Sequence, residues 1–326
     1  MGGDSARRAR ILAAVERYQN AAPCAAQTPL PDVAATSGST RLLYLAGRGV
    51  PLVLIPSLVN PPDVLDMPGQ SFARFLAKGF AVHIIDWGRP DPAMSQLSLA
   101  GLVEERLAPL LRTLERPVLA GYCLGGALAI AAARLVYARA LLTLAATWDL
   151  HAYPSEQRAQ LAALWSQVKT ISAATGTVSM DMIQPAFWAL DPALPVRKYE
   201  RYAGMPPGSA QALRFERLED WANGGHPLPF RAAQDLFERG FAGNMLARDW
   251  VVGGERVDPA AISCPWLDIR ASDDRIVPAA AAPPAPERRT VPLGHVGMIV
   301  GSRAEQEVWT LVREWLQTQT RINSSF

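Results

Sequence analysis

The chain has few of the residues that build metal centres, disulfide frameworks or basic nucleic-acid surfaces. Its 3 cysteines, Cys24, Cys123 and Cys264, match neither a zinc-ligand spacing nor an even set of disulfide partners. Its 32 basic and 30 acidic residues nearly balance, and the basic residues are spread along the chain. We therefore expect no metal, no nucleic-acid partner, and reduced thiols in a cytoplasmic protein.

Long apolar runs are also missing. No stretch of about 18 uninterrupted apolar residues occurs, so we expect no membrane span. The first apolar stretch, residues 11–15, ends at Glu16 and is too short for the hydrophobic part of a signal peptide. Apolar side chains between Ile11 and Tyr18 recur at helical spacing, which predicts a short amphipathic helix. We expect this helix to pack on the protein, with docking on another surface as the alternative.

Short apolar runs instead alternate with amphipathic stretches along most of the chain. The predicted strands are residues 41–46, 51–55, 82–86, 118–122, 140–145, 266–270 and 289–291. The predicted helices of the same region are residues 71–78, 99–114, 125–137 and 305–316. This alternation is typical of an α/β fold with a mostly parallel sheet covered by helices on both faces.

The alternation divides the chain into four parts. Residues 1–39 are predicted as the N-terminal helix and a linker rich in proline, alanine and serine, and residues 40–149 as the first part of the α/β core. Residues 150–256 are helical in pattern and rich in aromatic side chains, and we interpret them as an inserted cap. Residues 257–326 complete the core. The alternative for the cap is a subdomain that uses the same aromatic residues to pack a core of its own.

The strongest motif lies at residues 121–126, with the sequence Gly-Tyr-Cys-Leu-Gly-Gly. It follows a predicted strand and precedes a predicted helix, which is the context of a nucleophile elbow with Cys123 in place of serine. The glycines let the backbone turn sharply, and the N-terminus of the helix favours a thiolate and an oxyanion. A buried structural cysteine beside a glycine-rich turn is the alternative, which the complete pattern disfavours.

Histidine occurs at 4 positions, and one of them fits the same kind of site. His295 lies in a Gly-His-Val-Gly loop between a predicted strand and the last predicted helix, where the histidine of a hydrolase triad belongs. His83 lies inside a predicted strand and is interpreted as a packing residue. His151 and His226 have no supporting motif and stay open.

The acid of a triad is expected after the strand at residues 266–270. Asp273 and Asp274 both follow it, and either carboxylate could orient an imidazole. We prefer Asp274, which directly precedes an Arg-Ile-Val-Pro turn, and keep Asp273 in reserve. A solvated turn without a catalytic role is the alternative.

Several motifs act together as a family signature. They are Ile-Pro-Ser-Leu-Val-Asn-Pro-Pro at 55–62, Asp-Trp-Gly at 86–88, the cysteine motif, Trp-Asp-Leu at 148–150, Gly-Gly-Glu-Arg-Val-Asp at 253–258, Asp-Arg-Ile-Val-Pro at 274–278 and Gly-His-Val-Gly at 294–297. From about residue 40 to 320, the chain resembles the polyhydroxyalkanoate synthases, especially the short catalytic subunits of two-subunit synthases. This family lies within the α/β-hydrolase superfamily. The chain departs from it at Arg275, where histidine is usual.

The resemblance implies an acyltransferase that moves 3-hydroxyacyl groups from coenzyme A to a growing polyester. Cys123 would be the nucleophile, His295 the base, and Asp274 the acid that orients the imidazole. The backbone N–H groups of Leu124 and Val59 would form the oxyanion hole. The resemblance further implies an acyl-CoA substrate, no cofactor, a second synthase subunit or a homodimer as partner, and a location at the surface of polyester granules.

Two other functions remain open on the same residues. A hydrolase of thioesters, esters or lactones could use the same triad with water as acceptor. The cysteine motif alone also resembles dienelactone hydrolases, although Cys123 and Asp274 lie further apart than those small, uncapped enzymes require. A silent accessory subunit ranks last, since it has no chemical need for the three residues together.

Overall fold

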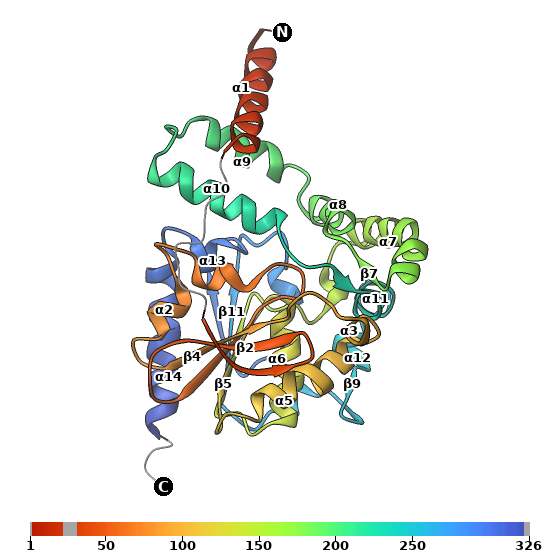
Figure 1. Cartoon of the computed structure of the whole chain (residues 1–326), viewed down its shortest axis with the longest axis vertical. Helices are drawn as coiled ribbons and strands as arrows, with labels where there is room; N and C mark the ends of the chain where they lie inside the picture. Colours follow the sequence, from red (N-terminus) through yellow and green to blue (C-terminus); the bar gives the residue numbers. More distant parts are fainter. Residues whose placement is uncertain (1, 22–30, 323–326) are drawn as a thin grey trace.

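The computed structural model describes residues 2–21 and 31–322 and shows a central sheet between two layers of helices (Figure 1). The sheet strands are β1 (Asp32–Ser37), β2 (Thr40–Ala46), β3 (Pro51–Ile55), β4 (Ala81–Asp86), β5 (Val118–Tyr122), β6 (Ala140–Leu144), β11 (Trp266–Ala271) and β12 (Glu287–Val291). Their order is β1-β2-β4-β3-β5-β6-β11-β12, and only the pairs made by β2 are antiparallel. The mostly parallel sheet confirms the predicted α/β class, and every predicted strand is present.

Each face of the sheet packs against its own set of helices. One set is α2 (Phe72–Leu76), α13 (Gly297–Val300), the π-helical turn η7 (Glu305–Trp309) and α14 (Thr310–Ile322); the other is α4 (Leu99–Gly101), the π-helical turn η2 (Leu102–Leu107), α5 (Ala108–Leu111) and α6 (Leu124–Leu135). Neighbouring residues of β3 divide between the two layers, since Leu52 packs with the first set and Val53 with the second. A strand that is buried on both faces must be apolar throughout, which explains the continuous apolar runs of the sequence.

The prediction that residues 1–39 form only a helix and a linker is wrong for their last part, because residues 32–37 form the edge strand β1. This strand pairs with β2 across a tight turn at Gly38, whose φ is +59°. Its side chains are small and largely exposed, so the segment lacks the apolar alternation by which a strand is recognised. Residues 22–30, including Cys24, lie outside the described residues.

Helices dominate the segment between β6 and β11, which contains the predicted cap. They are the turn η3 (Leu150–Ala152), α7 (Ser155–Thr175), α8 (Met180–Leu190), α9 (Leu194–Ala203), α10 (Ala210–Asn223), α11 (Phe230–Gln234), the π-helical turn η4 (Asp235–Phe241) and α12 (Met245–Arg248). Four strands of two residues form two small ladders apart from the main sheet: β7 (Thr177–Val178) with β8 (Leu228–Pro229), and β9 (Val251–Val252) with β10 (Glu255–Arg256). The short helix α3 (Pro92–Ser95) follows β4, and 3-10 turns lie at η1 (Pro62–Asp66), η5 (Pro259–Ala261) and η6 (Ala279–Ala281).

The predicted N-terminal helix is α1 (Gly2–Gln19), which packs against α9 of the middle segment (Figure 1). Arg7 forms a bidentate ion pair with Glu200, and the Arg17 guanidinium lies 3.7 Å from the centre of the Tyr202 ring. This helix is therefore packed on the protein, as the sequence favours. Within residues 2–21 and 31–322, no helix combines the length and hydropathy that crossing a bilayer requires.

Candidate active site

Cys123 occupies a strained turn between β5 and α6. Its φ of +58° lies in a region that side chains other than glycine rarely adopt, at a typical cost of about 1–3 kcal/mol. The flanking glycines allow the strand and helix to come close. A Cβ atom on Gly121 would lie 2.4 Å from the carbonyl oxygen of Gly125, and one on Gly125 would lie 2.1 Å from that of Ile55. The turn therefore requires glycine at both positions and presents Cys123 at the N-terminus of α6.

His295 and Asp274 come together from the two loops that follow β11 and β12. The Nδ1 atom of His295 lies 2.6 Å from Oδ2 of Asp274, and both side chains are buried. The other carboxylate oxygen accepts hydrogen bonds from the backbone N–H groups of Ile276 and Val277, each at 2.8 Å. Asp273 is exposed and bonds to Ser272 instead. The structure thus brings Asp274, the preferred acid, to the imidazole.

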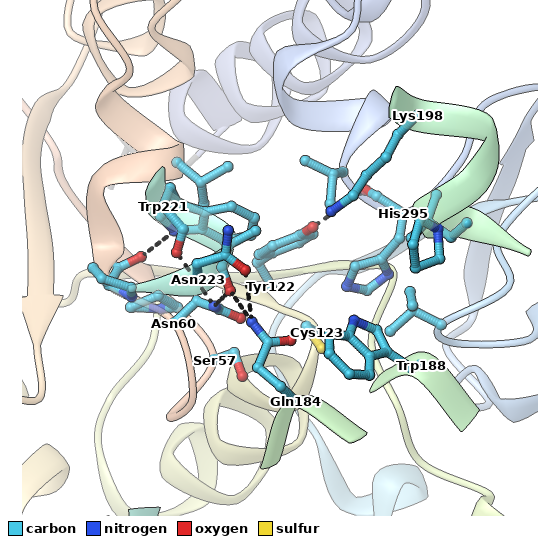
Figure 2. Close-up of a pocket in the computed structure, with 18 residues that line it drawn as sticks. Ser57, Asn60, Tyr122, Cys123, Gln184, Trp188, Lys198, Trp221, Asn223 and His295 are labelled. Carbon is cyan, nitrogen blue, oxygen red and sulfur yellow. Dashed lines mark hydrogen bonds between the residues drawn. The ribbon is translucent and has the colours of Figure 1, made fainter. Parts of the chain in front are cut away.

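Charged neighbours control the protonation of His295. Burial lowers its pKa, but the carboxylate of Asp274 and the thiol group of Cys123 raise it more strongly, to about 10. The ring is also held in place by Tyr122, whose ring centre lies 5.0 Å away and whose hydroxyl donates to the His295 carbonyl oxygen at 3.2 Å. Figure 2 shows the imidazole directed toward the sulfur of Cys123. A protonated imidazole in this position favours a neighbouring thiolate.

The other histidines lie away from this group. His83 on β4 packs 5.4 Å from Tyr44, between ring centres, and its Nδ1 atom pairs with the carbonyl oxygen of Ala81. His151 is exposed and pairs with the carbonyl oxygen of Ala242. Neither these two residues nor His226 line the cavity that contains Cys123.

The two proposed oxyanion donors, Leu124 and Val59, line a cavity together with Cys123. Leu124 is the first residue of α6, so its N–H has no acceptor one turn earlier in the helix. The N–H of Val59 donates to the hydroxyl of Ser57 at 3.4 Å. The loop that carries Ser57 and Val59 is held by the indole N–H of Trp87, which donates to the carbonyl oxygen of Pro56 at 3.2 Å. Their oxyanion role stays a prediction.

A cavity of about 150 Å³, called the central cavity below, contains Cys123 and His295 and is bounded on its other side by α8, α9 and α10 (Figure 2). Amide side chains connect its walls. Gln184 on α8 donates to the carbonyl oxygen of Ala222 at 2.9 Å and to the side chain of Asn223 at 3.1 Å. Asn60, from the loop after β3, donates to the same carbonyl at 3.3 Å. No sequence motif marks these amides, which meet only through the fold.

A second cavity of about 90 Å³, called the apolar pocket, adjoins Cys123 on the side of α7 and η4. Its walls are aliphatic and aromatic, apart from Ser57, Thr147 and Tyr153. The hydroxyls of the last two lie 3.4 Å apart and satisfy each other. This chemistry suits a hydrocarbon chain. Among the described residues, no group of three or more histidine, cysteine or acidic side chains could hold a metal ion.

Comparisons with curated proteins find similar chains of one kind. No model of a protein family matches the chain. The poly(3-hydroxyalkanoate) polymerase subunit PhaC of Haloferax mediterranei is 25% identical over 94% of this chain and 67% of its own length. The PhaC subunit of Allochromatium vinosum is 28% identical over 82% of this chain and 80% of its own. The chain is a homologue of the PhaC subunits. The resemblance to polyhydroxyalkanoate synthases is thereby confirmed.

Solved structures identify the fold. A hydrolase from Pseudomonas aeruginosa PA01 superimposes with a TM-score of 0.54 at 19% identity, over 89% of this chain and 98% of its own. A thermophilic esterase from Thermogutta terrifontis superimposes with a TM-score of 0.51 at 19% identity, over 90% of this chain and 99% of its own. These likenesses confirm the α/β-hydrolase fold for this PhaC homologue.

Proposed function

We propose that the chain is an acyltransferase that moves 3-hydroxyacyl groups from coenzyme A to a growing polyester. The observation that carries the proposal is the hydrogen-bonded pair of His295 and Asp274 beside Cys123, in a homologue of PhaC. A cysteine nucleophile suits such a transfer, because the covalent intermediate is itself a thioester. The free energy of the acyl-CoA bond is therefore kept for the next acceptor.

The reaction takes place in two halves. The thiolate of Cys123 attacks the thioester carbonyl, while His295 carries the thiol proton and passes it to the departing sulfur of coenzyme A. The N–H groups of Leu124 and Val59 stabilise the oxyanion formed at the carbonyl. A hydroxyl of the polyester, or of a second substrate, then attacks the acyl-cysteine and gives its proton to His295. Asp274 keeps the imidazole in the required tautomer throughout.

Residues 150–256 act as a cap in this proposal. Residues of α8, α9 and α10 line the central cavity, and residues of α7 and η4 line the apolar pocket next to Cys123. Such a cover limits the access of water to the acyl-cysteine and so favours polymerisation over hydrolysis. We further propose that the chain works with a partner subunit or as a homodimer. Its place would be at the surface of polyester granules in the cytoplasm.

The test is to incubate the purified protein with a 3-hydroxyacyl-CoA and to follow free thiol and polymer separately. We expect thiol release matched by ester bonds in polymer, and neither product with Cys123→Ala. Thiol release with free 3-hydroxy acid and no polymer would identify a hydrolase instead. No release of thiol by the intact protein, alone or supplied with a PhaC partner subunit, would contradict both enzymatic functions.

A further inference from the structure

A third cavity lies on the outer side of His295 and is distinguished by its arginines. It has a volume of about 620 Å³ and is called the basic groove here. Arg197 and Arg201 reach it from α9, Arg214 from α10, and Arg275 from the loop after β11. The volume is in the range of cavities that hold small-molecule ligands.

The positive charge of the groove is not neutralised by the protein. Its acidic residues are Asp191 and Asp273, against four arginines. Asp191 pairs with Arg197 at 2.6 Å and approaches Arg275 at 3.7 Å. In the described part of the chain, no carboxylate lies within 4.0 Å of Arg201 or Arg214, whose side chains stay exposed. Like charges that gather without partners repel one another, and an anionic ligand relieves that repulsion.

The groove adjoins the central cavity. Both are lined by Leu194, Ile276, His295 and Val296, and Ile276 also lines the apolar pocket. The three cavities therefore meet beside the reacting groups and differ in chemistry. The apolar pocket suits an acyl chain, the central cavity holds Cys123 and His295, and the basic groove offers guanidinium groups. Arginine is well suited to phosphate, which it can bind through two parallel hydrogen bonds.

We infer that the basic groove binds the phosphate groups of coenzyme A while the thioester reaches Cys123 through the central cavity. This inference rests on the proposed function, because it names how that substrate is held. It places His295 between the acyl group and the phosphates, next to the sulfur that departs. The two unpaired arginines, Arg201 and Arg214, supply most of the attraction.

The first test measures binding without chemistry, in protein that carries Cys123→Ala. Titration calorimetry with coenzyme A is expected to show binding that weakens with added salt. Adding Arg201→Gln and Arg214→Gln together removes two charge-assisted contacts and is expected to weaken binding roughly 100-fold. The matched control is Arg48→Gln with Arg116→Gln, two exposed arginines that precede β3 and β5 at the opposite edge of the sheet. Adenosine 3′,5′-bisphosphate should follow the same pattern, and pantetheine, which has no phosphate, should not.

The second test measures selectivity in protein that retains Cys123. The ratio of kcat/KM for an acyl-CoA to kcat/KM for the acyl N-acetylcysteamine thioester is expected to fall roughly 100-fold in the groove variant. The control variant should keep the ratio. An unchanged ratio and unchanged coenzyme A binding in a folded groove variant overturn the inference and leave the proposed function standing. Arginine-dependent binding of coenzyme A by a protein that turns over no thioester supports the groove and contradicts the proposed function.

Discussion

The sheet and the middle segment, residues 150–256, both border the active site but are packed very differently. Strands β3, β5 and β6 are almost entirely buried, and the turn at Cys123 leaves no room for a Cβ atom at Gly121 or Gly125. In the middle segment, α8 contains a proline at Pro185, and Trp188 is 53% exposed although it faces the central cavity. The sheet thus holds the turn at Cys123 in a tightly packed position, and the middle segment supplies a large share of the walls of the three cavities.

The ends of the middle segment are nevertheless fastened together. Asn244, in a left-handed conformation with φ of +59°, accepts a hydrogen bond from the N–H of Leu150 and donates one to Asp149, both at 2.9 Å. The N–H of Asp149 in turn donates to the carbonyl oxygen of Ala281 in the core, at 2.9 Å. Any movement of the segment is therefore expected in its helices α8 to α10, far from these ties along the chain.

The largest expected effect comes from removing the proposed nucleophile, Cys123, at the end of the sheet strand β5. Cys123→Ala should lower the rate of acyl transfer by roughly 10⁴-fold or more, since the members of such a catalytic unit act together. Cys264→Ala is the matched control, because burial raises the pKa of the Cys264 thiol to about 11 and keeps it neutral. Thiol release from an acyl-CoA measures both. Substantial activity in the Cys123 variant would move the chemistry to another residue.

The next largest effect distinguishes the roles of two adjacent carboxylates, Asp273 and Asp274, in the loop after β11. Asp274→Asn should lower kcat by roughly 10³- to 10⁴-fold, because the amide favours the wrong tautomer of His295. Asp273→Asn removes an exposed carboxylate that lines the basic groove, so its effect on kcat should be within a few-fold. Steady-state kinetics of both folded variants make the comparison. A larger loss of kcat in the Asp273 variant would reverse the assignment.

The two regions should also differ in how they tolerate an added methyl group. Gly125→Ala places a Cβ 2.1 Å from the carbonyl oxygen of Ile55 and should lower the free energy of unfolding by roughly 3 kcal/mol. Gly208→Ala in the middle segment also has a positive φ, +72°, but no neighbouring atom within 4 Å. It should cost only about 1 kcal/mol. Urea unfolding measures both, and equal losses would show that the turn can relax.

The contrast between regions also explains what could be predicted from sequence. The strands, the turn at Cys123 and the pairing of His295 with Asp274 depend on short motifs and on strand order, which local patterns express. Arg201, Arg214 and Arg275 come from two helices and a loop and meet only through tertiary packing. The sequence does not indicate strand β1, because its small, exposed side chains carry no apolar alternation. Local patterns thus predict the sheet and the turn at Cys123 well, and the arginines of the basic groove poorly.

The last expected effect is a pH dependence of stability that arises from His295. The folded protein raises the pKa of His295 from its ordinary 6.5 to about 10, with the carboxylate of Asp274 as the main cause of the increase. Folding therefore favours the protonated imidazole. The resulting stabilisation is fully present below pH 6.5 and is lost as the pH rises through about 10.

Comparison with His295→Gln isolates this contribution, because other groups also titrate at alkaline pH. The Tm of the intact protein should exceed that of the variant by a few degrees near neutral pH, and the difference should shrink as the pH approaches 10. Asp274→Asn removes the main cause of the raised pKa and leaves burial, which lowers it, and Cys123, which raises it, so the imidazole should titrate well below 10. NMR of the ring protons follows this titration directly. A difference in Tm that stays constant across this pH range would show that the imidazole is neutral in the folded protein. Cys123 would then have to lose its proton to His295 during the attack, because no ion pair between the two would exist beforehand.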